Sequence, residues 1–108
     1  MYVAVYRYRP RAGAEGQLVA LQQRVAALFH GAGCRRSLLL RPQVEGNDWL
    51  DLDFFDSESH AAAVEARVAA EVEPLYQQFL ELVDGATPAE LAAEGFVVAV
   101  DSATLLAG

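Results

Sequence analysis

The chain has 108 residues, of which 54% are hydrophobic, and its formal net charge is -7. This length fits a single domain over residues 1–108. The negative charge disfavours nucleic acid and anionic membrane surfaces as partners. All eight basic residues are arginine, which excludes a Schiff-base lysine, pyridoxal phosphate chemistry and a Walker-type phosphate loop.

The cysteine and histidine content leaves little room for a metal or redox site. Cys34 is the single cysteine, so no intramolecular disulfide can form, and two histidines cannot build a His-rich metal site. The first residues alternate like a strand and lack the charge order of a signal peptide. No apolar run is long enough to span a bilayer. The sequence therefore predicts a soluble cytoplasmic protein with no metal and no recognisable flavin or nicotinamide cofactor.

Hydrophobic periodicity predicts alternating strands and helices. Strands are expected at 2–9, 36–42, 49–56 and 96–101, and helices at 14–32 and from 57 onwards. Gly46 and Asn47 should supply the positive φ angles of a hairpin, and Asp56 or Ser57 should cap the second helix. Pro74 removes a helical hydrogen bond, so we expect that helix to break there and a shorter one to follow.

Two weaker patterns lie near the end of the chain. Thr87 and Glu90 have the spacing of a capping box, which predicts one or two helical turns before Gly95. Residues 102–108 form a weakly apolar tail.

The element order β-α-β-β-α-β predicts a ferredoxin-like α+β domain. Right-handed crossovers favour one four-stranded antiparallel sheet in the order 4-1-3-2, with both helices on one face. In strand 49–56 the side chains of Leu50, Leu52 and Phe54 point one way. We expect the helices to cover this aliphatic face.

The opposite sheet face collects aromatic rings. Its rings are Tyr2, Tyr6, Tyr8, Trp49 and Phe55. A monomer does not normally expose so much aromatic surface. We therefore expect a second copy of the chain to cover this face, which would make the protein a homodimer.

Several segments together resemble a known superfamily. They are residues 6–13 (YRYRPRAG), Gly33-Cys34, residues 53–59 (DFFDSES) and residues 73–76 (EPLY). Over residues 2–84 the chain resembles the dimeric α/β-barrel superfamily and, within it, the antibiotic biosynthesis monooxygenase-like domains. This resemblance implies a dimer with pockets between sheet and helices or at the dimer face. Members of the family include cofactor-free oxygenases of activated phenols or quinols and haem-degrading enzymes.

Departures from the haem-degrading members argue against haem cleavage. The first strand has no asparagine, and His60 comes earlier than the histidine those members use. The aromatic residue at the end of the third strand is Phe54 or Phe55, where they carry tryptophan.

Two carboxylates are the leading candidates for chemistry. Asp51 and Asp53 share one face of their strand, next to Tyr6 and Tyr8 of the first strand. Asp53 or His60 could remove a phenolic proton while Tyr6 and Tyr8 orient the oxygen. Alternatively, the aspartates pair with arginines of a partner subunit or lie at a solvated rim of the barrel, and His60 is a solvated residue in the first turn of a helix.

The remaining candidates would bind substrate. Trp49 and Phe55 could stack on a planar ligand, or they could be dimer contacts. Arg41 belongs to a set of arginines that could form an anion site or ordinary salt bridges. Cys34 is expected to be a small buried residue.

The sequence thus predicts a cofactor-independent monooxygenase acting on a small aromatic or quinol substrate. The alternative is a non-catalytic dimeric module of the same fold that binds a small ligand or a partner. A pocket holding Tyr6, an aspartate and His60 together would favour the enzyme. A sheet face filled by the partner, with no cavity, would favour the module.

Overall fold

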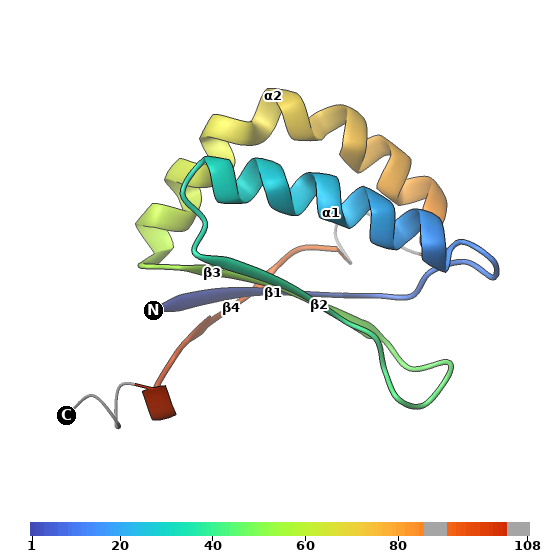
Figure 1. The fold of residues 1–108 in the computed structure, drawn as a ribbon, viewed down its shortest axis with the longest axis horizontal. Helices are drawn as coiled ribbons and strands as arrows, with labels where there is room; N and C mark the ends of the chain where they lie inside the picture. Colours follow the sequence, from blue (N-terminus) through green and yellow to red (C-terminus); the bar gives the residue numbers. More distant parts are fainter. Residues whose placement is uncertain (86–90, 104–108) are drawn as a thin grey trace.

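The computed structural model describes residues 1–85 and 91–103. Its elements are β1 (Tyr2–Tyr8), α1 (Glu15–Gly31), β2 (Arg36–Leu40), β3 (Trp49–Phe55), α2 (Glu58–Leu82) and β4 (Glu94–Val97). The strands form one antiparallel sheet in the order β2-β3-β1-β4, and both helices lie on the same side of it (Figure 1). The ferredoxin-like prediction, including the 4-1-3-2 order, is confirmed. None of the described helices is long and apolar enough to cross a membrane.

Local signals explain most of the helix boundaries. After α1, Gly33 adopts a φ of +114°, and the Cys34 amide donates to the Phe29 carbonyl at 2.9 Å. The Ser57 hydroxyl caps α2 by accepting a hydrogen bond from the His60 amide at 3.1 Å. In the hairpin only Gly46 has a positive φ angle, so the expectation of a second one at Asn47 is wrong.

The predicted helix break at Pro74 is also wrong, because α2 continues through it. Pro74 lies on the exposed side of the helix, so the carbonyl it leaves without an amide partner faces solvent. On the opposite side, Val68 and Leu75 are buried in the core. Packing on both sides of the proline holds the helix together, and α2 arches over the sheet (Figure 1).

The last strand differs from the prediction as well. β4 begins at Glu94 and ends at Val97, so it is shifted towards the N-terminus and includes Gly95. The Tyr2 ring lies directly over Gly95, where an added Cβ would come 2.8 Å from a ring carbon. A larger residue at this position of the strand would therefore displace the Tyr2 ring. The expected Thr87–Glu90 capping box and the tail beyond residue 103 lie outside the described residues.

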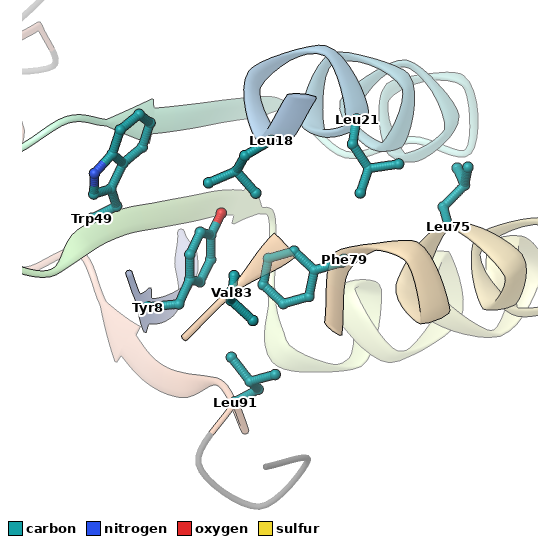
Figure 2. Close-up of a cluster of buried hydrophobic side chains, with 8 residues drawn as sticks. All are labelled: Tyr8, Leu18, Leu21, Trp49, Leu75, Phe79, Val83 and Leu91. Atoms are coloured by element: carbon teal, nitrogen blue, oxygen red, sulfur yellow. The ribbon is translucent and has the colours of Figure 1, made fainter. Parts of the chain in front are cut away.

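The two sheet faces are covered in the opposite sense to our expectation. The face that carries the rings, here called the inner face, packs under α1 and α2. Tyr8, Trp49 and Phe55 are only 5%, 4% and 0% exposed. Figure 2 shows the Tyr8 ring beside Phe79 and Val83, below the leucines of α1. The rings are thus core residues of their own chain.

The aliphatic face, here called the outer face, has no helix over it (Figure 1). The cross-strand register brings its side chains together in one patch. The patch consists of Leu38, Leu40, Leu50, Leu52, Phe54 and Phe96, which surround Val3 and Val5; these two valines are themselves buried, at 6% and 8% exposed. Leu40 and Phe96 are each 44% exposed. The exposed apolar surface of the sheet is therefore on the outer face.

Candidate functional site

Two adjoining cavities lie between the inner face and the helices. The inner cavity has a volume of about 170 Å³ and the outer cavity about 400 Å³. Rings and aliphatic side chains line the inner cavity: Tyr6, Tyr8, Phe29, Val72, Leu75, Tyr76, Phe79 and Leu91. The outer cavity opens between α1 and β2, with Gln23, Ser37, Arg41 and Trp49 in its wall. Gln22, Val25, Asp51 and Asp53 line both cavities and form the junction between them.

A triangle of hydrogen bonds holds Asp51 at the junction. The Tyr8 hydroxyl donates to Asp51 Oδ2 at 2.8 Å. Gln22 Nε2 donates to the same oxygen at 2.9 Å and to the Tyr8 hydroxyl oxygen at 2.7 Å. Because that hydroxyl oxygen accepts from Gln22, its own hydrogen is directed to Asp51. Asp51 Oδ2 therefore receives two hydrogen bonds.

The second carboxylate oxygen of Asp51 is open to the cavity. Within the described chain, Oδ1 takes part in none of these hydrogen bonds, and no fully buried side-chain nitrogen or oxygen lacks a partner. Oδ1 therefore has accessible surface at a residue that is otherwise mostly buried. This is the atom of Asp51 that a ligand can reach.

Burial changes the protonation of both aspartates. It raises the pKa of Asp51 to about 7, repulsion from Asp53 adds to the rise, and the Tyr8 hydrogen bond opposes it. Burial also raises the pKa of Asp53, against a hydrogen bond that the Ser37 hydroxyl donates to its Oδ1 at 2.6 Å. Asp51 thus exchanges its proton near neutral pH, as a general acid or base requires.

Tyr6 and Tyr8, two of the three tyrosines that line the inner cavity, remain neutral phenols. Burial raises the pKa of Tyr6, and the nearby charges of Glu65 and the aspartates raise it further. Burial and Asp51 raise the pKa of Tyr8 in the same way. Neither phenol is a base at neutral pH, but each can hydrogen-bond to a ligand oxygen. The Tyr8 hydroxyl already donates to Asp51, so of these two tyrosines it is Tyr6 that can donate to a ligand.

Trp49 and Arg41 form one wall of the outer cavity. The Arg41 guanidinium carbon lies 5.1 Å from the centre of the Trp49 ring. Arg41 Nη2 is 3.8 Å from Glu15 Oε2, a loose ion pair that leaves most of the arginine side chain exposed. The rim of the outer cavity is therefore the one part of the site with a positive charge.

Two predicted site residues lie elsewhere. Phe55 is fully buried in the core and lines neither cavity. His60 Nδ1 accepts a hydrogen bond from the Asp56 amide at 2.9 Å, and its ring packs edge-on against Phe55 at 5.9 Å. His60 also lines neither cavity, so the structure does not bring it together with Tyr6 and Asp53.

Sequence reasoning missed Gln22 and Ser37. Gln22 follows Leu18 by one helical turn and so shares its face of α1. Ser37 alternates with Leu38 on β2, and this alternation places it opposite Asp53 in the register. Both signals were present in the spacing.

The arginines do not gather into an anion site. Four of the eight pair with four different carboxylates: Arg7 with Glu94, Arg9 with Asp48, Arg35 with Asp56 and Arg41 with Glu15. Cys34 is buried, as expected, and burial raises the pKa of its thiol. Across residues 1–85 and 91–103, no three His, Cys, Asp or Glu side chains are grouped to hold a metal ion.

Comparison with models of known protein families and with curated proteins found no match. Solved structures do match. SnoaB, a cofactor-independent oxygenase from Streptomyces nogalater, is similar with a TM-score of 0.74 and 16% identity over 93% of this chain and 94% of that chain. Rv0793 from Mycobacterium tuberculosis has a TM-score of 0.72 and 16% identity over 94% and 97%. An uncharacterized NIPSNAP domain protein from Burkholderia xenovorans has a TM-score of 0.67 and 18% identity over 93% and 96%.

At these identities the likeness is one of fold. It extends over nearly the whole of each chain, and it agrees with the strand order and the one-sided helix layer described above. The chain therefore shares the ferredoxin-like fold of these solved structures.

Proposed function

We propose that the protein is a cofactor-independent monooxygenase of small phenolic or quinol substrates. The observation that carries this proposal is Asp51, a cavity carboxylate with a pKa of about 7 and one oxygen open to a ligand. Support also comes from the fold it shares with SnoaB, which is described as a cofactor-independent oxygenase. The site offers a base, a neutral phenol donor and an aromatic cavity.

In the proposed reaction Asp51 Oδ1 removes a proton from the substrate hydroxyl or from an activated carbon. The resulting anion is electron-rich and transfers electrons to molecular oxygen. One oxygen atom enters a ring carbon as a carbonyl oxygen, and the other leaves as water with the two hydrogens that the substrate loses, one from that carbon and one from the hydroxyl group. The substrate supplies all the electrons. Tyr6 holds the substrate oxygen, and Tyr8 and Gln22 fix the orientation of Asp51.

Asp51 is a better candidate for the base than the residues first chosen. Asp53 Oδ1 accepts a short hydrogen bond from Ser37, and His60 lies outside both cavities. We assign Asp53 the indirect role of raising the pKa of Asp51 through repulsion. Trp49 and Arg41 would contact the part of the substrate that reaches the outer cavity.

We further propose that two copies pair through the outer face. The patch around Leu52 and Phe54 is apolar and has no cover from the described chain, and burying it in a dimer removes it from water. Pairing there leaves the cavities on the other side of the sheet available to substrate. The lone cysteine and the acidic charge suit a cytoplasmic protein.

Oxygen uptake with a panel of anthrone-like and quinol compounds tests the proposal. Asp51→Asn should lower the rate at least about 100-fold, because a positioned base contributes on the order of 10² to 10⁴. Asp84→Asn, at an exposed aspartate outside both cavities, is the matched control and should keep the wild-type rate. Equal rates for wild type and Asp51→Asn would remove the proposed base. Ligand binding without any oxygen uptake would favour the non-catalytic module.

A further inference from the structure

The inner cavity is the smaller of the two. Its volume limits the size of the group that can reach Asp51 from the side lined by aromatic rings. An engineered protein cavity of about 150 Å³ takes up benzene. The inner cavity, at about 170 Å³, therefore has room for one aromatic ring and not for three fused rings. The outer cavity, at about 400 Å³, can hold a further group of comparable or larger size.

We propose that the ligand of this site is a single-ring phenol with an acidic side arm attached ortho to the hydroxyl group. The ring occupies the inner cavity, the hydroxyl meets Asp51 Oδ1 and the arm extends through the outer cavity to Arg41. This substrate class rests on the proposed function for its reaction, but its binding geometry follows from the cavities alone.

The ortho position follows from the residues that the cavities share. Asp51 and Gln22 line both cavities, so a hydroxyl at Asp51 stands at the junction. An arm that runs from the inner ring to the outer cavity must pass the same junction. It must therefore leave the ring beside the hydroxyl, because an arm in the para position would point away from the junction, against the rings of α2.

The charged residues in the cavity walls favour an acidic group at the far end of the arm. Asp51 and Asp53 repel an anion at the junction, so a charged group attached directly to the ring is disfavoured. Arg41, at the far wall of the outer cavity, has only a loose ion pair with Glu15 at 3.8 Å and a mostly exposed side chain. Its guanidinium is held over the Trp49 ring and can accept a carboxylate in place of Glu15.

Binding of two positional isomers tests the arrangement. We would titrate ortho-hydroxyphenylpropanoate, para-hydroxyphenylpropanoate and the uncharged ortho-propylphenol into the full chain and follow the heat of binding. The two acids have the same charge and size. The ortho acid should bind at least about tenfold more tightly than the para acid, a difference of about 1.4 kcal/mol.

Substitution of Arg41 tests the acidic arm. Arg41→Gln should weaken binding of the ortho acid at least about fivefold and leave ortho-propylphenol unchanged. Arg35→Gln removes another exposed, ion-paired arginine that lines neither cavity, and it should change neither ligand. Equal affinity for the two isomers would overturn the ortho arrangement. An Arg41→Gln variant that binds the ortho acid like wild type would overturn the acidic arm.

These measurements do not depend on turnover, so the two proposals can fail separately. Arg41-dependent binding of the ortho acid, with no oxygen uptake by its hydroquinone analogue, would leave this ligand class standing and remove the oxygenase. Oxygen uptake with fused-ring compounds, with no preference between the isomers, would keep the oxygenase and remove this ligand class.

Discussion

The inner and outer faces of the sheet are built from the same strands but have different roles. Along β3, Asp51 and Asp53 face the helices, whereas Leu50, Leu52 and Phe54 face away from them. The inner face is covered by the chain itself and includes polar groups in a cavity. The outer face is apolar around Leu52 and Phe54 and carries charged residues towards its margins, and no described helix covers it; these charged residues are Arg7, Arg36 and Glu94.

The contrast shows where a small domain can accommodate chemistry. A face packed under its own helices can leave a cavity between rings, and that cavity shields carboxylates from water and raises their pKa. A flat aliphatic face has no such space and suits contact with an identical surface. The candidate site and the proposed interface are thus separated by the thickness of one sheet, and substitutions on neighbouring residues should affect one without the other.

The largest effect is expected from the adjacent pair Phe54 and Phe55. Phe55→Ala empties a fully buried position of the inner face and should cost about 3–5 kcal/mol of the free energy of unfolding, at any protein concentration. Phe54→Ala, on the outer face, should cost less, and its cost should grow with protein concentration because it weakens dimerisation. Denaturant unfolding at several concentrations measures both. A concentration-independent loss of equal size in the two variants would contradict the assignment of the faces.

A charge on the outer face should separate the dimer. Leu52→Asp places a carboxylate in the middle of the proposed contact, which should raise the dissociation constant about 100-fold or more, equivalent to about 3 kcal/mol. Sedimentation equilibrium should then find monomers at concentrations where wild type is dimeric. Val44→Asp, at an exposed hairpin position, is the control and should remain dimeric. A wild-type chain that is monomeric throughout would refute the interface.

On the inner face, the Asp51→Asn variant should be less active than the wild type and, at high pH, more stable. The folded state holds the Asp51 proton up to a pH of about 7, whereas the unfolded chain releases it near its ordinary value of about 4. Stability of the wild type therefore falls as the pH rises from about 4 to 7. Asparagine does not titrate, so the stability of the variant should not fall in this way. Above pH 7 its free energy of unfolding should exceed that of the wild type by on the order of 1–3 kcal/mol. Thermal unfolding across this pH range measures the difference, and parallel curves for the two proteins would refute the raised pKa.

The smallest effect is expected from the pair Ser37 and Leu38 on β2. Ser37→Ala removes a hydrogen bond to Asp53 and should cost about 1 kcal/mol at pH 8. The cost should shrink as the pH falls and Asp53 takes up a proton, because the bond favours the charged carboxylate. Leu38→Ala, on the outer face, should have a cost that does not vary with pH. Urea unfolding at three pH values distinguishes them, and a pH-independent Ser37→Ala would weaken the account of Asp53.

Local patterns predicted much of the fold. Alternation located β1 and β3, and the spacing from Leu18 to Phe29 located α1. The cap at Ser57 was also evident in the sequence. The break expected at Pro74 was wrong. Helix propensity includes the hydrogen bond that proline removes, but it does not include the burial of Val68 and Leu75 on either side of it.

The candidate site was predictable only in part. Tyr6, Tyr8, Asp51 and Asp53 were identified from their shared strand faces, and the structure places all four at the inner cavity. His60 was chosen for its chemistry and its place at a helix start, and neither property determines which way its ring points. In the structure it turns to the Asp56 amide and Phe55.

The sequence by itself determined that the strand beginning at Trp49 has two unlike faces, because side chains alternate at every second residue whatever surrounds them. Only the tertiary structure decided which face the helices cover, because that depends on the path of the connections after β1 and β3 and not on any local period. It also decided that Gln22, Tyr8 and Asp51 meet, since these residues are 14 to 43 positions apart in the sequence. Spacing along a chain is a local property, but a carboxylate oxygen open to a cavity is a property of the packed whole.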